Sequence, residues 1–218
     1  MPYPAGHRDR TREKIVRSAR RLFNRRGFGE VSIDDIMSQA GLTRGGFYTY
    51  FESKSDLYAQ AIRQALREPP VTQWPEIRVD FTAIDAARQV IQAYLSQQHF
   101  EDIEGSCPLV ALPSDVSRSD RRVKRAFETV FQGMVDLFAQ SLRQDHREDR
   151  ELALAIAGLC VGGMAVARSL ENRALADALR DAARRAALQL GGWQQAARQG
   201  SGGPRKPKPQ RHRPAPRR

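Results

Sequence analysis

The stretch of residues 32–54 constrains what this chain can fold into more than any other part of it. Ser32 stands three residues before Asp35, a spacing typical of a helix N-terminus. Apolar residues then recur at helical spacing, and Gly41 can adopt the left-handed conformation that ends a helix. Thr43 is a second candidate N-cap, before another short segment that is rich in aromatic residues. Two short helices joined by a glycine turn predict a helix-turn-helix.

The second of these short helices has an unusual composition. Gly45 and Gly46 each lower helix propensity by about 1 kcal/mol relative to alanine. A helix that lacks side chains on one face can lie close to a DNA backbone, and this interpretation fits the regular flanking pattern better than a simple turn does. Phe47 and Phe51 lie four residues apart and can face inward, which leaves Arg44 and two tyrosines to point outward.

Residues 41–57 resemble the DNA-binding domain of the tetracycline-repressor (TetR) family. The family pattern G-x-[ST]-x-[GA]-x-[FIL]-Y-x-[HY]-F-x-[SN]-K-x-x-L is matched from Gly41 to Leu57. The commonest residue at position 50 in the family is His, whereas Tyr50 here keeps a phosphate contact possible without an imidazolium charge. The resemblance implies a TetR-like repressor that binds a palindromic operator in double-stranded DNA as a homodimer and is released by a small apolar ligand.

The candidate DNA contacts follow from this helix-turn-helix. Arg44 lies in the first turn of the reading helix, where a guanidinium can pair bidentately with guanine. Other residues can contact DNA through hydroxyl groups, backbone N–H groups or positive charge, and we expect these to be Ser32, Thr43, Gly45, Gly46, Tyr48, Tyr50 and Lys54. The arginines of the preceding helix, expected over 8–26, either contact phosphates or form a solvated face, and both interpretations remain open.

The net charge of +11 is concentrated at the two ends of the chain. Residues 1–67 carry +6 and residues 199–218 carry +7, whereas the middle carries −2. A basic block beside a helix-turn-helix is what phosphate neutralisation requires. The nearly neutral middle does not resemble a nucleic-acid-binding surface.

Helical periodicity beyond the helix-turn-helix predicts an all-α fold with about nine helices. We expect a three-helix helix-turn-helix domain over 8–54, a larger ligand-binding and dimerisation body over 55–192, and a disordered basic Pro/Arg-rich tail over 193–218. Prolines at 69, 70 and 75 indicate a linker. The helices expected after it cover 81–100, 109–117, about 25 residues ending near 142, 151–169 and 174–190.

Two helices of the body, 151–169 and 174–190, are rich in small residues. Small residues allow helices to approach closely, either within one subunit or between two. The resemblance points to the second use, a four-helix dimer interface, for which the candidates are Gly158, Gly162, Ala165, Leu179, Ala183 and Ala186.

The helices between 81 and 142 carry more aromatic and flexible apolar residues than a bundle of this size needs. Plain core is the better interpretation for each residue singly. Taken together, and with the resemblance, they predict an apolar effector pocket lined by Tyr94, Phe100, Cys107, Leu109, Leu112, Phe127, Phe131, Met134 and Phe138.

Cys107 raises the alternative of a switch operated by an electrophile or oxidant. A following helix N-terminus lowers the pKa of a thiol, whereas the nearby acidic residues raise it, so both a reactive and an inert thiol remain open. Cys160 lies among small residues on a helix and is expected to be inert. Two cysteines cannot form a disulfide scaffold. Neither a run of about 18 apolar residues nor an apolar N-terminal segment is present, so we expect a cytoplasmic protein that does not bind membranes.

The sequence offers no pattern for catalysis. Its four histidines are scattered, and no Ser/His/Asp grouping or phosphate-binding glycine loop is found. His99 lies near Glu101, Asp102, Glu104 and Cys107, but this spacing matches no familiar metal site, and a solvated acidic loop is the better interpretation. We therefore expect no enzyme, cofactor or metal. A non-specific nucleoid-type DNA-binding protein remains an alternative, although it would leave the neutral body without a purpose.

Overall fold

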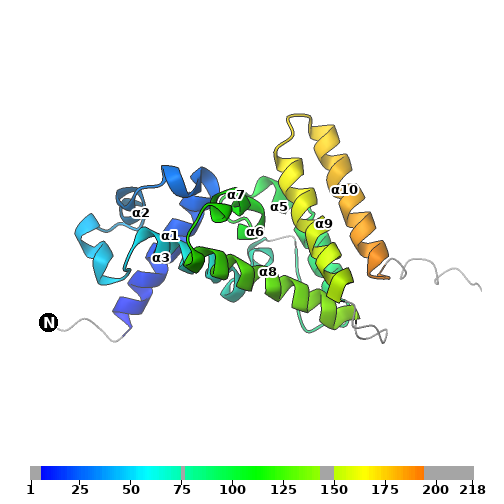
Figure 1. The fold of residues 1–218 in the computed structure, drawn as a ribbon, viewed down its shortest axis with the longest axis horizontal. Helices are drawn as coiled ribbons and strands as arrows, with labels where there is room; N and C mark the ends of the chain where they lie inside the picture. Colours follow the sequence, from blue (N-terminus) through cyan, green and yellow to red (C-terminus); the bar gives the residue numbers. More distant parts are fainter. Residues whose placement is uncertain (1–5, 75–76, 143–149, 194–218) are drawn as a thin grey trace, which may run out of the picture.

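The computed structural model describes residues 6–74, 77–142 and 150–193, and every regular element within them is a helix (Figure 1). This confirms the all-α prediction. The molecule is elongated, with a head at the N-terminal end and two long antiparallel helices at the other end. The predicted basic tail lies outside the described residues except for Trp193, whose ring centroid is 6.4 Å from that of Phe138.

The head consists of four helical elements: α1 (His7–Glu30), α2 (Ile33–Gln39), the 3₁₀ helix η1 (Arg44–Thr49) and α3 (Lys54–Arg67). The range of α1 joins two helical segments across a kink at Gly27, whose φ of 76° and ψ of 170° are not helical, so the first segment ends near the predicted residue 26. Gly41 has a φ of 66° and makes the predicted turn after α2. The reading element η1 is a 3₁₀ helix, not the regular helix expected, because it is short and two of its six residues are glycines.

The body contains these elements: η2 (Pro70–Gln73), α4 (Ala86–Tyr94), α5 (Gln97–Glu101), α6 (Pro108–Ala111), α7 (Pro113–Ser117), α8 (Arg121–Leu142), α9 (Arg150–Arg168) and α10 (Arg173–Leu190). Two helices predicted from the sequence are split. The segment 81–100 divides because the Ser96 hydroxyl accepts the N–H of His99 and starts a new helix. The segment 109–117 divides at Pro113, which has no N–H to continue the ladder.

Helix α3 connects the head to the body. It packs against α8 on one side and against α1 of the head on the other (Figure 1). At the far end of the molecule α9 packs against both α8 and α10. By length and composition alone α9 could also cross a membrane, but a helix packed inside a bundle passes the same test.

Candidate DNA-binding surface and effector cavity

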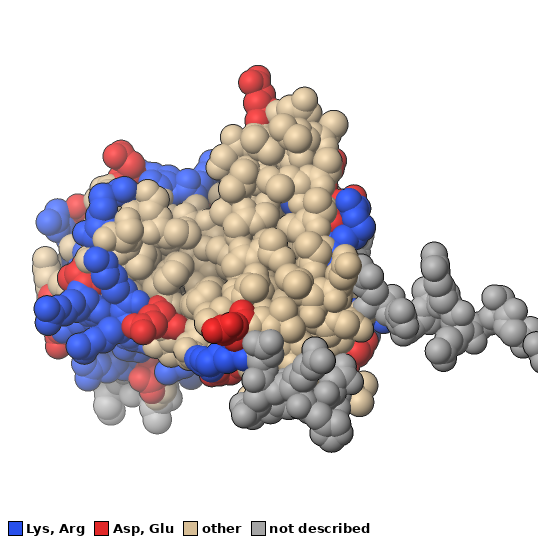
Figure 2. Space-filling model, turned by 45° about the vertical axis from the view of Figure 1, so that its right-hand side comes forward, with Lys and Arg blue, Asp and Glu red and all other residues tan. Residues whose placement is uncertain are grey.

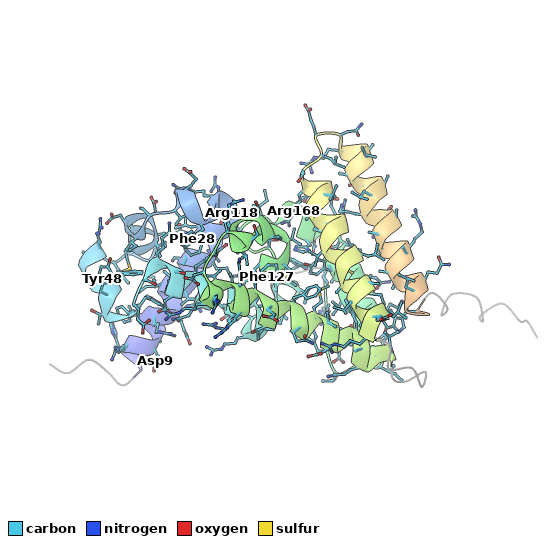
Figure 3. The ribbon with its side chains drawn as sticks, in the orientation of Figure 1. Asp9, Phe28, Tyr48, Arg118, Phe127 and Arg168 are labelled. Carbon is cyan, nitrogen blue, oxygen red and sulfur yellow. The ribbon has the colours of Figure 1, made fainter. Side chains whose placement is uncertain are left out.

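The reading element η1 has an inward aromatic face and an outward polar face. Phe47 is fully buried, and its ring centroid lies 5.7 Å from that of Phe51. Tyr48 follows it and is 65% exposed. Figure 3 shows Tyr48 at the tip of the head, at the end of the molecule opposite α9 and α10. Phe47 therefore anchors the element, while its neighbour is presented to solvent.

Arg44 lies on the exposed face of η1 and is ion-paired within the head. Its Nη1 is 2.7 Å from Oδ2 of Asp34 on α2, and both side chains are more than half exposed. Thr43 and Gly45 flank it and are exposed, and a Cβ at Gly45 would meet no atom within 4 Å. The structure thus brings four of the predicted contacts, Thr43, Arg44, Gly45 and Tyr48, onto one exposed element.

Two predicted contacts, Gly46 and Tyr50, lie in more enclosed positions, whereas Ser32 is exposed and caps α2. A Cβ at Gly46 would lie 3.7 Å from the methyl group of Met37, so this glycine faces α2. Tyr50 is half-buried. The hydroxyl of Ser32 accepts the N–H of Asp35 at 3.0 Å, and the Ser32 N–H donates to the Asp35 carboxylate at 2.8 Å. The N–H and the hydroxyl of Ser32 both donate to the Asp35 carboxylate, and these two hydrogen bonds hold the pKa of Asp35 below its usual value.

Lys54 is engaged within the head in the free protein. Its Nζ lies 2.5 Å from the carbonyl oxygen of Phe28 and 4.3 Å from the centroid of the Phe28 ring. Partial burial lowers the pKa of this ammonium group. Lys54 therefore ties the start of α3 to the end of α1, a contact that no sequence signal predicts because 26 residues separate the pair.

One arginine beside the reading element was not singled out by sequence reasoning. Nη2 of Arg8, in the first turn of α1, donates to the carbonyl of Thr49 at 3.1 Å. This contact places an exposed positive charge at the end of η1. Figure 2 shows that lysine and arginine side chains gather over the head, whereas the face toward α9 and α10 is largely uncharged.

The head is also bonded directly to the body. The N–H of Phe28 donates to Oδ2 of Asp115 on α7 at 2.8 Å. A Cβ at Gly27 would lie 2.8 Å from the same oxygen, so a glycine is needed there for space as well as for its φ. Arg122 at the start of α8 lies 2.9 Å from Glu52 in the head. The position of the head therefore depends on α7 and α8 as well as on α3.

A cavity of about 500 Å³ opens between the C-terminal end of α3, η2, α4 and α8. Its walls are mostly apolar, and the lining residues are Ala65, Leu66, Arg67, Pro69, Pro70, Val71, Thr72, Phe81, Val90, Tyr94, Cys107, Leu109, Val130, Gly133, Met134 and Leu137. The segment 69–72, predicted as a linker, is thus one wall of the cavity. The composition of this segment does not indicate that role. The segment reaches the cavity only because α3, which precedes it, packs on α8.

Four of the nine predicted pocket residues line this cavity: Tyr94, Cys107, Leu109 and Met134. The other five do not line it, namely Phe100, Leu112, Phe127, Phe131 and Phe138. These side chains pack into the core or against it on other faces of their helices. Apolar side chains of both kinds look alike in sequence, because periodicity shows which face is buried but not whether that face meets a neighbour or a hollow.

Two polar groups of the cavity wall are deeply buried. The Tyr94 hydroxyl has no nitrogen or oxygen partner within the described residues. Burial raises the pKa of the Cys107 thiol, so the reactive thiolate is disfavoured. Burial also raises the pKa of Cys160 to about 12, which agrees with the expected inertness of that thiol.

The loop 102–106, predicted as acidic and solvated, is held by side chains from two distant helices. Nδ2 of Asn24 on α1 donates to the carbonyls of Glu104 and Ser106, at 3.0 and 2.9 Å. Arg168 on α9 donates to the Ser106 hydroxyl at 2.6 Å and to the Asp102 carbonyl at 3.1 Å. The loop thus joins the head to the far end of the body.

His99 is a structural residue of the same region. It is fully buried, with Nδ1 2.6 Å from the Tyr94 carbonyl and Nε2 3.2 Å from the Ser106 hydroxyl. Burial, and then the nearby Arg168 charge, lower the pKa of His99 to about 3, so the ring is neutral. Within the described ranges no group of three or more His, Cys, Asp or Glu side chains could hold a metal ion.

The small residues of α9 and α10 serve two different faces. A Cβ at Gly163 would lie 2.6 Å from Cβ of Ala183, so Ala183 packs inside the subunit and does not face a partner. By contrast, a Cβ at Gly158 or Gly162 would meet no atom within 4 Å. The remaining candidates, Ala165, Leu179 and Ala186, are half-buried.

Part of the outer surface of these two helices is apolar. Leu154 and Val166 on α9 are 42% and 52% exposed, and Leu175 and Leu190 on α10 are 54% and 44% exposed. In Figure 2 a broad face without charged side chains covers this end of the molecule. Exposed large apolar side chains on such an uncharged face are typical of an interaction surface.

Residues 15–61 match the family model described as bacterial regulatory proteins, tetR family. Residues 83–186 match the model of the C-terminal domain of LmrA/YxaF-like transcriptional regulators. The chain belongs to the TetR family. Its predicted class, a TetR-like DNA-binding regulator, is thereby confirmed at the level of the family.

Curated relatives of this TetR-family chain include regulators from Bacillus subtilis. The HTH-type transcriptional regulator LmrA is 23% identical over 170 residues, which cover 74% of this chain and 88% of LmrA. The uncharacterized regulator YfiR is 32% identical over 62 residues, which cover 28% of this chain. The matched regions span 30% of YfiR and 53% of the uncharacterized regulator YerO.

Solved structures show the same fold. The reduced form of NemR from Escherichia coli superposes with a TM-score of 0.65 at 20% identity, over 83% of this chain and 96% of NemR. A TetR-family regulator from Agrobacterium tumefaciens gives a TM-score of 0.63 at 19% identity, over 83% of this chain and 98% of that one. TetR-family regulators bind DNA, typically act as dimers with small-molecule effectors, and are not typically enzymes.

Proposed function

We propose that this TetR-family protein is a transcriptional repressor that binds a palindromic operator as a homodimer and leaves it when a small apolar ligand binds. The observation that carries the proposal is that one helix joins the DNA-binding head to the cavity. Helix α3 begins at Lys54, which is bonded to α1, and its last turn supplies Ala65, Leu66 and Arg67 to the cavity wall. A ligand that repacks this turn changes the orientation of the head.

The apolar outer face of α9 and α10 supports the homodimer. Gly158 and Gly162 leave space for a partner helix to approach closely, and the exposed leucines beside them would be buried by it. Two such faces related by a two-fold axis would form a four-helix interface. In that dimer the two heads would enter successive major grooves, which explains a palindromic operator.

The size and polarity of the cavity support a small apolar effector. Its volume of about 500 Å³ lies within the usual range for small-molecule sites, and most of its lining is aliphatic or aromatic. The Tyr94 hydroxyl lies beside the Cys107 thiol and has no nitrogen or oxygen partner in the described part of the chain, so a ligand could offer it a stronger hydrogen bond. We place the protein in the cytoplasm, with its operator, and assign it no catalytic role.

Cys107 supports a second candidate function, because a thiol that lines the cavity could be modified by an electrophile. Its raised pKa argues against a rapid reaction. We therefore favour reversible ligand binding over a thiol switch, and the specific repressor over a non-specific nucleoid protein.

The test begins with DNA fragments selected from a genomic pool by the purified full-length protein. A selected palindrome bound much more tightly than random duplex at physiological salt supports the specific regulator, whereas equal affinity supports the nucleoid-type protein and overturns our proposal. Release of the selected operator by apolar compounds is then compared between wild type and Cys107→Ser. Release by electrophiles that disappears in Cys107→Ser would establish the thiol switch instead.

A further inference from the structure

The effector cavity adjoins a second hollow of opposite character. A polar groove of about 450 Å³ lies between α1 and α3, and its lining residues are Arg12, Glu13, Val16, Gln60, Arg63, Gln64, Leu66, Arg67 and Glu68. Leu66 and Arg67 belong to both linings. The last turn of α3 therefore borders both an apolar hollow in the body and a charged hollow against the head.

Two arginines of this groove have no partner. Arg63 and Arg67 lie four residues apart on α3, so they share one exposed face, and neither forms an ion pair or hydrogen bond with any residue of the described ranges. Like charges at this spacing repel each other and destabilise the helix. An anion held between them would relieve that repulsion.

The other charged groups of the groove are already engaged or face solvent. Arg12 donates to Gln60, and its guanidinium lies 5.4 Å from the ring centroid of Phe51. Glu68 accepts a hydrogen bond from Gln64 at 3.0 Å, while Glu13 is exposed. The positive charge that remains available is therefore that of the two α3 arginines, beside the mouth of the apolar cavity.

We propose that the two hollows form one site for an anionic amphiphile, with its apolar part in the cavity and its single negative group between Arg63 and Arg67. This inference rests on the proposed function, because it names the class of effector for the same cavity. Both arginines lie on α3, and the opposite wall of the groove is α1 of the head. The charged group would therefore contact the junction between the head and the body.

The first test compares three probes with the same alkyl chain: decanoate, decanol and decylamine. Each displaces the neutral fluorescent dye N-phenyl-1-naphthylamine from the full-length protein in the absence of DNA. We expect decanoate to bind about tenfold more tightly than decanol, the effect of roughly one charge-assisted hydrogen bond, and decylamine to bind most weakly. Equal affinity for decanoate and decanol, or no displacement by any probe, would overturn the proposal.

The second test asks whether Arg63 and Arg67 cause the preference for decanoate over decanol. Arg63→Gln with Arg67→Gln keeps side-chain length and should bring decanoate and decanol to about the same affinity without weakening decanol. Arg121→Gln with Arg125→Gln is the matched control, because it removes the same two positive charges, four residues apart, from exposed positions of α8 that line neither hollow. A preference for decanoate that survives in the double variant would contradict our assignment, as would its loss in the control.

The test of the ligand site and the test of the proposed function can give different outcomes. Dye displacement reports only on the ligand class, while selection of an operator reports only on specific DNA binding. A protein that prefers decanoate but selects no operator would refute the repressor and leave the site in place. A protein that selects an operator but binds all three probes alike would refute the site and leave the repressor in place.

Discussion

Nη1 of Arg44 lies 2.7 Å from Oδ2 of Asp34, so the side chain proposed to read a base is held by a carboxylate of α2 in the free protein. Both side chains are exposed, and a pair of this kind contributes little to stability. On DNA the guanidinium can exchange the carboxylate for a guanine edge. Asp34 also places a negative charge near the DNA, which opposes contacts in the wrong register.

Replacing Arg44 should reduce sequence discrimination more than overall affinity. Arg44→Ala is expected to cost about 1–3 kcal/mol at one base pair of the operator and little elsewhere. Competition assays with single-base variants of the selected operator measure this. An equal loss of affinity at every base-pair variant would indicate a phosphate contact instead.

Removing Asp34, the partner of Arg44, should raise the affinity for non-specific DNA. Asp34→Asn frees the guanidinium and removes a negative charge, so affinity for random duplex should rise more than affinity for the operator. Glu13→Gln on α1 makes the same change in charge away from η1 and is the control. If the two variants show the same ratio of specific to non-specific affinity, the ion pair has no role in selectivity.

Lys54 should contribute to the stability of the head whether or not it contacts a phosphate. Lys54→Met keeps an apolar stem over the Phe28 ring but leaves the Phe28 carbonyl without its donor. We expect the free energy of unfolding to fall by about 1 kcal/mol, as measured by urea denaturation. If Lys54 also binds phosphate, affinity for all DNA sequences should fall alike, and the slope of affinity against salt should become shallower.

Adjacent glycines of α9 should respond differently to the same substitution. Gly162→Arg enters open space and should give a folded monomer with poor operator binding, as seen by analytical ultracentrifugation and circular dichroism. Gly163→Arg should destabilise the subunit itself, because its side chain would meet Ala183 across the helix pair. Normal dimers of Gly162→Arg would show that the interface lies elsewhere.

His99 should make the protein less stable in mild acid. Its pKa is lowered from 6.5 to about 3 in the folded protein, so below pH 6.5 the unfolded chain binds a proton that the folded chain does not. The stabilisation is complete above pH 6.5 and is lost progressively as the pH falls toward 3, by about 2 kcal/mol at pH 5. Comparing the pH dependence of unfolding between wild type and His99→Gln isolates this contribution, and parallel curves would contradict it.

The sequence by itself determined the helix-turn-helix, because the interactions that form it are local. The capping box joins Ser32 to Asp35, Gly41 makes its own turn, and Phe47 lies four residues from Phe51. Each of these depends on neighbours within one or two helical turns, so residue types and spacing specify them. The helical class of the body follows from periodicity for the same reason.

Only the tertiary structure decided which apolar faces enclose a cavity and which polar side chains meet. The contacts of Lys54 with Phe28 and of Asn24 with Ser106 join residues 26 and 82 positions apart. The cavity wall of residues 69–72 and the packing of Gly163 against Ala183 also depend on how whole helices are placed. Helix periodicity shows that a face is buried, but the choice of its partner depends on the packing of several helices at once, which no local pattern encodes.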